Sequence, residues 1–212
     1  MSFRSVSPLN LRLLAAALAL LGLTGPGWAQ DAPPAPERHH TLSPSPPKTP
    51  AERDAVLSDL YAQLASSEDE LAAKSVADNI ERVWVHSGSP TVDLLLGRAV
   101  QAVSEKDYGK ALRFLDRVVE QAPDFTEGWS QRAYVHFQLN DVRQALGDLR
   151  RTLALDPNHF KALDGLAQVL RDIGEKRAAL QVLRRLADVH PYWPGTEQTI
   201  EELSREVEGQ GI

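Results

Sequence analysis

The stretch from Thr126 to His159 decides the fold: TEGWSQRAYVHFQLNDVRQALGDLRRTLALDPNH. Its apolar side chains recur at helical spacing, first between Trp129 and Phe137 and again between Leu146 and Leu153. Each half therefore has one apolar and one polar face, as an amphipathic helix requires. The stretch predicts two helices, over 127–139 and 142–155, joined by a short turn.

The same pattern returns along the chain at a constant interval, equal to the length of this stretch. Pro123, Pro157 and Pro191 are evenly spaced at that interval, and Pro90 misses the register by one position. The same interval separates the small and aliphatic residues of three further series: Ala65, Ala99, Ala133 and Ala167; Ala77, Ala111, Ala145 and Ala179; Leu115, Leu149 and Leu183. This regularity is typical of a repeat protein, in which each unit buries its apolar face against its neighbours.

The repeat resembles the tetratricopeptide repeat, a 34-residue unit with the pattern W-x2-L-G-x2-Y, then A-x3-F, then P. The copy at 126–159 has Trp129, Arg132, Ala133 and His136 at the first four motif positions, followed by Ala145, Leu149 and Pro157. Arg132 and His136 depart from the pattern. The resemblance implies an all-α fold, a helix-turn-helix repeat solenoid that winds as a right-handed superhelix.

Three repeats follow one another, over 92–125, 126–159 and 160–193. A degenerate copy lies in residues 52–91, and its predicted helices, 54–67 and 71–85, are expected to form the first pair of the stack. This copy has Trp84 where the others have an aliphatic residue or Thr152. Residues 194–212 predict a C-terminal capping helix and tail, because Ile200, Leu203 and Val207 form one narrow apolar stripe on an acidic helix.

Residue types within the repeat have physical roles. The alanines, one per helix, allow two helix axes to approach closely where they cross. Asp107, Asp141 and Glu175 lie in the turns and can favour the start of the next helix. The repeated prolines end the second helix of each unit.

The first 29 residues predict a secretory signal peptide. Arg4 and Arg12 are basic, residues 13–23 have no polar side chain, and residues 27–29 are typical of a cleavage site after Ala29. The apolar run is too short for a membrane-spanning helix, which needs about 20 residues. Cleavage would change the net charge from −6 to −8 and give a periplasmic or secreted protein without stable membrane insertion.

Residues 30–51 predict a proline-rich disordered linker. Between Pro33 and Pro50, both included, proline occurs seven times, and it fixes φ and lacks an N–H donor. His39 and His40 lie in this segment, but one flexible pair offers fewer ligands than a defined metal site needs.

Composition excludes several classes of function. The chain has 212 residues, no cysteine and a net charge of −6, which argues against disulfide frameworks, thiolate chemistry and general nucleic-acid binding. It has no nucleophile elbow, zinc-binding helix motif or phosphate-binding glycine loop. His86, Ser87 and Ser89 are too close in sequence to form a catalytic triad. The sequence predicts no enzyme, no cofactor and no metal.

In the tetratricopeptide repeat family the first helix of each repeat lines a concave groove, so the resemblance implies a site that binds a protein or peptide segment. The implied contact residues are Leu96, Val100 and Val103; Ser130, Tyr134 and Phe137; Asp164, Gln168 and Arg171. Tyr134 and Phe137 are the expected anchors. Some family members grip a C-terminal carboxylate with Lys and Asn, but Leu96 and Val100 occupy those positions here, which disfavours that mode.

A second hypothesis concerns a ladder of arginines, Arg117, Arg151 and Arg185, on the outer face of the second helices. It could make the protein an envelope structural component or a binder of an anionic polymer. Acidic residues on the same helices, such as Asp116 and Glu120, favour a solvated face of paired charges instead. The two hypotheses, a scaffold or assembly factor with a peptide groove and a polymer binder, differ in their salt dependence.

Overall fold

The computed structural model describes residue 47, residues 49–207 and residue 209. The predicted signal peptide and most of the predicted linker lie outside the described residues. The described part contains these helices: α1 Pro50–Ala65, α2 Glu70–Trp84, α3 Pro90–Ser104, α4 Tyr108–Gln121, α5 Thr126–Gln138, α6 Val142–Leu155, α7 Phe160–Asp172, α8 Lys176–Val189 and α9 Thr196–Val207. The all-helical fold predicted from the sequence is confirmed. Helix α1 already begins at Pro50, inside the predicted linker, with Thr49 as its N-cap.

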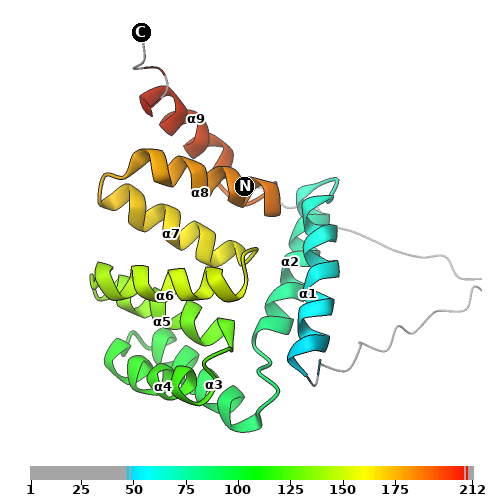
Figure 1. Cartoon of the computed structure of the whole chain (residues 1–212), viewed down its shortest axis with the longest axis vertical. Coiled ribbons are helices and arrows are strands. Elements are labelled where there is room, and N and C mark those ends of the chain that lie inside the picture. The colour runs from blue at the N-terminus through cyan, green and yellow to red at the C-terminus, as the bar shows by residue number, and fades with distance from the viewer. Residues whose placement is uncertain (1–46, 48, 208, 210–212) are drawn as a thin grey trace, which may run out of the picture. The chain divides into compact units, whose positions relative to one another are not determined.

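Helices α3 to α8 form three consecutive pairs. Each first helix packs on its own second helix, and each second helix packs on the first helix of the next pair. The repeated alanines lie at these contacts: Ala99, Ala111, Ala133, Ala145, Ala167 and Ala179 are all buried. The pairs stack in the order expected of a repeat solenoid, and Figure 1 shows them in sequence from α3 and α4 at the bottom to α7 and α8 near the top.

The turn inside each pair has the same backbone geometry three times. Lys106, Asn140 and Gly174, which occupy the same position of successive repeats, have φ values of 59°, 59° and 83°. The next residue donates its N–H to a carbonyl five positions earlier, as Asp107 does to Ala102 at 2.9 Å. This is the Schellman ending of a helix, which needs a left-handed residue.

Two of the three acidic turn residues cap the following helix. Asp107 Oδ1 accepts from the N–H of Lys110 at 2.9 Å, and Asp141 Oδ1 accepts from the N–H of Gln144 at 3.2 Å. Glu175 makes no side-chain cap bond with α8. The capping role predicted from the sequence therefore holds for the aspartates only.

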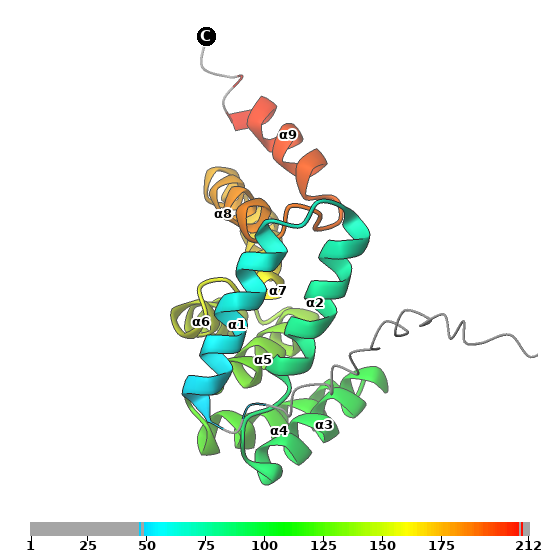
Figure 2. The ribbon, with the colours of Figure 1, turned by 90° about the vertical axis from the view of Figure 1, so that its right-hand side faces the viewer.

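The N-terminal pair does not stack as the first repeat, which corrects the expectation for residues 52–91. Helices α1 and α2 instead run across the ends of the stacked helices, beside the loops that join one repeat to the next (Figures 1 and 2). Their buried residues, among them Tyr61, Ile80 and Trp84, share one hydrophobic core with Phe160 and Leu163 of α7 and with residues of α8.

Aromatic stacking and polar contacts explain this position. The Trp84 ring lies parallel to the ring of His159, with centroids 3.8 Å apart, and 4.6 Å from Phe160. Tyr61 donates to Asp156 Oδ2 at 2.5 Å and accepts from the Trp84 indole at 3.2 Å. Burial, together with the Asp156 carboxylate, raises the pKa of Tyr61, so the hydroxyl stays protonated and can donate.

The displaced pair leaves one side of α3 without a preceding repeat. Leu94 of α3 is 57% exposed. The residues at the same position of the next two repeats, Gly128 and Ala162, are buried. At the other end of the stack α9 packs on α8 and buries Leu203, the central residue of the predicted apolar stripe. Among the described residues, α9 thus covers the C-terminal end of the solenoid, and no helix pair stacks on α3 at its N-terminal end.

Candidate peptide-binding groove

A hollow of about 410 Å³ lies between α5 and α7. Its lining includes five of the nine residues that the repeat register predicts for the groove: Ser130, Tyr134 and Phe137 from α5, and Asp164 and Gln168 from α7. The helical period of two neighbouring first helices places these side chains on one face. Five of the nine predicted positions thus lie together at one hollow.

The two predicted anchors have different surroundings. Tyr134 is 46% exposed. Phe137 is partly buried and packs against the core cluster that contains Ala133, Leu149 and Val169. Tyr134 is therefore the apolar side chain of this hollow most available to a partner, and Phe137 forms part of its floor.

Asp164 lies deeper in the same hollow. Its Oδ2 accepts from the side-chain amide of Gln168 at 2.7 Å. Burial raises the pKa of Asp164, and the indole of Trp193, the amide of Gln168 and the charge of Arg171 oppose that rise. The carboxylate of Asp164 is thus partly withdrawn from solvent.

A second hollow of about 340 Å³ continues along α7 toward α9. It shares Asp164 and Gln168 with the first hollow and is lined further on by Arg171 and by the first turn of α9, including Thr196 and Thr199. We call the two hollows together the α7 groove. Arg171 therefore belongs to its far end, away from Tyr134.

The three residues predicted from the first repeat do not line the α7 groove. Leu96 is only 2% exposed and belongs to the core formed by α3 and α4, so its prediction as a groove contact is wrong. Val103 packs against the same core, whereas Val100 is exposed on α3.

The register missed several residues that line the groove, among them Lys161 and Trp193. Trp193 occupies the last position of its repeat, where the earlier repeats have Phe125 and His159. That aromatic series was a signal in the sequence, although it does not by itself show which cavity the ring lines. Lys161 is paired with Glu81 of α2 at 2.7 Å.

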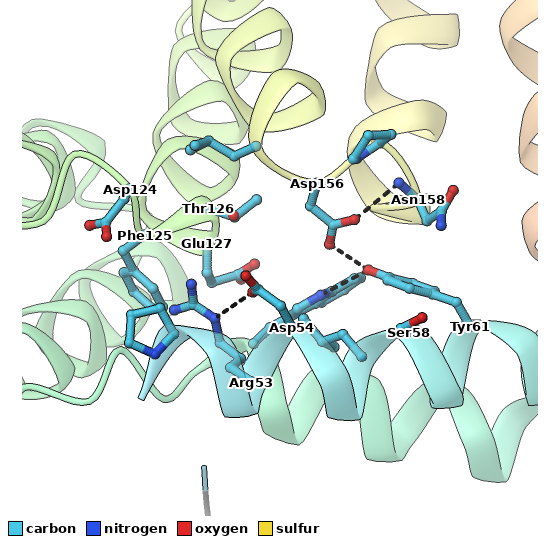
Figure 3. Close-up of a pocket in the computed structure, with 15 residues that line it drawn as sticks. Arg53, Asp54, Ser58, Tyr61, Asp124, Phe125, Thr126, Glu127, Asp156 and Asn158 are labelled. Carbon is cyan, nitrogen blue, oxygen red and sulfur yellow. Dashed lines mark hydrogen bonds and ion pairs between the residues drawn. The ribbon is translucent and has the colours of Figure 1, made fainter. Parts of the chain in front are cut away.

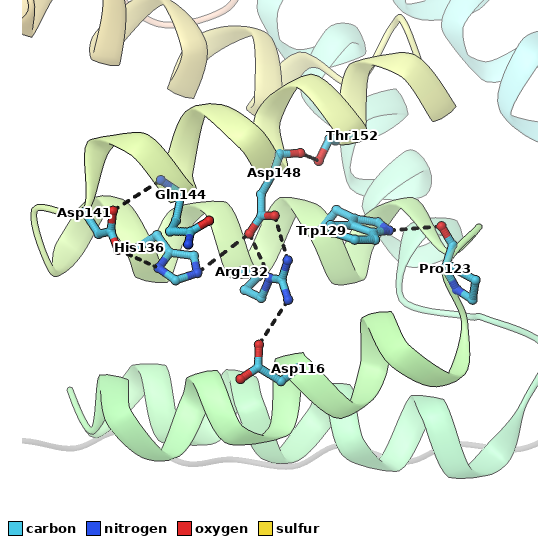
Figure 4. A network of polar contacts seen from close by, with 9 residues as sticks. All are labelled: Asp116, Pro123, Trp129, Arg132, His136, Asp141, Gln144, Asp148 and Thr152. Carbon is cyan, nitrogen blue, oxygen red and sulfur yellow. Dashed lines mark hydrogen bonds and ion pairs between the residues drawn. The ribbon is translucent and has the colours of Figure 1, made fainter.

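Arg132 and His136, the departures from the repeat pattern, belong to a polar network between repeats (Figure 4). Arg132 donates twice to the buried carboxylate of Asp148, each bond 2.8 Å long, and once to Asp116 at 3.0 Å. The ring of His136 lies 3.9 Å from Asp148 and also 3.9 Å from Asp141. A buried acid on the second helix thus explains basic residues on the first helix, where the pattern has apolar ones.

Another hollow of about 410 Å³ lies under α1, against the loops at 124–127 and 155–158 (Figure 3). Several of its polar side chains already have partners: Tyr61 bonds to Asp156, and Arg53 lies 3.7 Å from Asp54. A carboxylate oxygen of Glu127 lies 3.1 Å from Nε2 of the buried His159 ring. Of these contacts, the bond from Tyr61 to Asp156 joins α1 to the repeats.

Two of the three arginines of the ladder, Arg117 and Arg151, have partners within the chain. Arg117 pairs with Glu120 at 3.0 Å, and Arg151 donates to the carbonyl of Pro123 at 3.1 Å while lying over the Trp129 ring. Such local partners reduce the charge available to an anionic polymer.

The loop with His86, Ser87 and Ser89 also has a structural role. Asp93 Oδ1 accepts from both the N–H and the hydroxyl of Ser87, at 2.7 and 2.5 Å, and His86 lies 4.0 Å from the same carboxylate. These bonds fix the start of α3. In the described residues there is no group of three or more His, Asp or Glu that could hold a metal ion.

None of the described helices has the length and apolar character needed to cross a membrane.

Comparisons with known proteins agree with this architecture. No protein-family model matches the chain. A TPR repeat-containing protein of Rhizobium etli is 32% identical over 182 residues, which cover 79% of this chain and 89% of that protein.

Two solved structures share the fold at low identity. The first TPR of Spaghetti (RPAP3), bound to the HSP90 peptide SRMEEVD, has a TM-score of 0.54 at 16% identity and covers 57% of this chain and 98% of that one. The Sgt2 TPR domain from Aspergillus fumigatus has a TM-score of 0.52 at 20% identity and covers 57% of this chain and 82% of that one. The regular repeat period, the stacked helix pairs and the Rhizobium relative together establish that this chain belongs to the tetratricopeptide repeat (TPR) family.

Proposed function

We propose that this chain is an exported, non-catalytic interaction module, a scaffold or assembly factor, that binds a protein segment in the α7 groove. The observation that carries the proposal is Tyr134, a large ring that is 46% exposed on the wall of a hollow between two stacked repeats. An exposed aromatic side chain at the edge of a hollow is typical of a binding surface.

The solved TPR of Spaghetti supports the class of ligand, because it is bound to a peptide. That peptide, SRMEEVD, carries its acidic residues near the C-terminus. In this chain Leu96 is buried, Val100 is apolar and the groove holds Asp164. These features disfavour an acidic C-terminal tail, so the proposed ligand is an internal or non-acidic segment.

The experiment is capture of envelope proteins on the mature chain, residues 30–212, followed by mass spectrometry. Tyr134→Ser tests the groove. Leu139→Ser is the matched control, since Leu139 is a similarly exposed apolar residue at the end of α5 that does not line the groove. A partner retained by the wild type and by Leu139→Ser but lost with Tyr134→Ser supports the proposal. Equal retention by all three proteins contradicts it.

Export to the periplasm, or secretion, is part of the proposal. Its support is the order of basic, apolar and small residues in 1–29. N-terminal sequencing of the protein from the periplasmic fraction should give Gln30 as the first residue. Recovery of Met1 in an exported protein, or fractionation with integral membrane proteins, would contradict it.

A further inference from the structure

We propose that the α7 groove selects a segment in which a lysine or arginine lies beside an apolar anchor, with the basic side chain paired to Asp164 and the anchor against Tyr134. The inference rests on the proposed function, because it names the chemistry of the segment that the groove binds.

The position of Asp164 is the first argument. It lines both hollows of the α7 groove, as Gln168 does, so a segment that passes from one hollow to the other must pass this carboxylate. Tyr134 and Asp164 line the same hollow from neighbouring repeats. A segment that places an apolar side chain on the tyrosine therefore brings its next residues to the acid.

The charges around Asp164 are the second argument. Among the described residues no lysine, arginine or histidine forms an ion pair with its carboxylate. Lys161, the basic residue of the first hollow, is engaged with Glu81 at 2.7 Å. Arg171 lies two helical turns further along α7, near Asp172 and Glu202. The hydrogen-bond donors to Asp164 are thus neutral, and Arg171, whose charge lowers the pKa of Asp164, forms no ion pair with it.

The cost of that arrangement is the third argument. Burial raises the pKa of Asp164, which means that its ionised form is held less favourably here than in water. A basic side chain from a partner would supply an opposite charge in direct contact with Asp164, which Arg171 does not, at a partly buried site where solvent screens less than at an open surface. An acidic segment would add a second negative charge instead, on a chain whose net charge is already −6.

Selection from a phage-displayed library of random dodecapeptides tests the inference on the mature chain. Three proteins are compared with the wild type: Tyr134→Ser, Asp164→Asn, and Asp172→Asn as the matched control, which removes the same charge from an exposed site on the same helix. We expect the wild type and Asp172→Asn to enrich peptides with an aromatic or large aliphatic residue near a lysine or arginine. Asp164→Asn should keep the apolar preference and lose the basic one.

Titration of one selected peptide then measures the pairing. Replacing its basic residue by glutamine should weaken binding to the wild type about tenfold, which corresponds to about 1.4 kcal/mol. The same replacement should have little effect on binding to Asp164→Asn, because the two changes remove one interaction.

The outcomes separate the two proposals. In one outcome, the wild type enriches peptides without a basic preference, and the enrichment disappears with Tyr134→Ser. This outcome overturns the inference and leaves the proposed function of the groove standing. A basic preference that survives in Asp164→Asn, or equal tenfold losses in both proteins, also overturns the inference. Enrichment that does not depend on Tyr134 contradicts the proposed function itself.

Discussion

Tyr134 and Phe137 lie one helical turn apart, yet their side chains serve different purposes. Tyr134 is half-exposed on the groove wall, whereas Phe137 packs into the core between repeats. Tyr134→Ser should weaken a groove-bound peptide about thirtyfold, or about 2 kcal/mol, with little change in melting temperature. Phe137→Ala should lower the free energy of unfolding by about 2 kcal/mol. Peptide titrations and thermal melts on both variants check this, and a fall in stability with unchanged affinity for Tyr134→Ser would assign that ring to the core.

His190 gives the protein an acid-sensitive contact. It is buried at the end of α8, with its ring 5.3 Å from Phe160 and 5.4 Å from Trp193, and burial lowers its pKa. The unfolded chain then binds the proton more readily than the folded one, so stability falls as pH drops below about 6.5.

Replacing this ring by a non-titrating one isolates its contribution. Urea unfolding at several pH values between about 7 and 5 should show a smaller loss of stability for His190→Phe than for the wild type. Parallel pH dependences for the two proteins would exclude His190 as a cause of the acid sensitivity.

At the scale of single elements, the turn inside each repeat carries a measurable strain. Lys106 has a φ of 59° in an exposed turn, where a residue with a Cβ is disfavoured, whereas the equivalent Gly174 has a φ of 83°. Lys106→Gly should raise the free energy of unfolding by about 0.5–1 kcal/mol.

The converse change supplies the control. Nothing lies within 4 Å of a Cβ added to Gly174, so Gly174→Ala should lower stability by about 1 kcal/mol through the backbone alone. Urea midpoints of both variants measure the two effects. If both variants are stabilised, or both are destabilised, backbone strain does not explain the difference between the two turns.

The elements that follow from local pattern were predictable from the sequence. The repeat register predicts the helix pairs, the buried alanines and the side chains on the groove face, because these depend on helix periodicity and on contacts between neighbours in the chain. The register of the first helices also predicts that Tyr134 and Asp164 share one face, and the two residues do line one hollow.

The position of the N-terminal pair was not predictable in the same way. Its alanines fit the repeat register, so local pattern favours stacking on α3. Contacts far along the chain decide otherwise, since Trp84 stacks on His159 and joins the core around Phe160. The tryptophan at an otherwise aliphatic or threonine position was the one visible sign, but its partner depends on the tertiary fold. Leu96 was misplaced for a related reason, because its burial depends on how α3 packs on α4.

Across the whole molecule, the repeats should unfold together. Ala145 is fully buried where α6 meets its neighbours, and Ala145→Leu adds three heavy atoms at this crossing. We expect a loss of about 1–3 kcal/mol, against less than about 0.5 kcal/mol for the exposed change Gln138→Ala. Urea unfolding followed by circular dichroism decides this, and a wild-type midpoint for Ala145→Leu would contradict the repeat register.

The contacts that hold α1 and α2 to the repeats are open to a matched test. Tyr61→Phe removes the hydroxyl shared by Asp156 and Trp84 in a buried site, whereas Tyr192→Phe removes an exposed bond to the carbonyl of Glu68. Tyr61→Phe should lower the free energy of unfolding by about 1–3 kcal/mol, and Tyr192→Phe by about 1 kcal/mol or less. Hydrogen exchange should show faster opening of α1 in the first variant. Equal losses of unfolding free energy in the two variants would mean that the buried hydroxyl of Tyr61 stabilises the fold no more than an exposed hydrogen bond does.

The crossing of α1 and α2 over the repeat ends also sets the order in which the chain can complete its fold. Contacts within a solenoid are local, but Tyr61 bonds to a residue 95 positions later and Tyr192 to one 124 positions earlier. Contacts of such high contact order slow folding, because a long loop must close before they form. Helices α1 and α2 are synthesised first, but they can complete their packing only after the last repeat has been synthesised. A nascent chain that ends before Phe160 leaves the apolar faces of Ile80 and Trp84 without their partners, so truncated products of this protein should be the ones that need a chaperone.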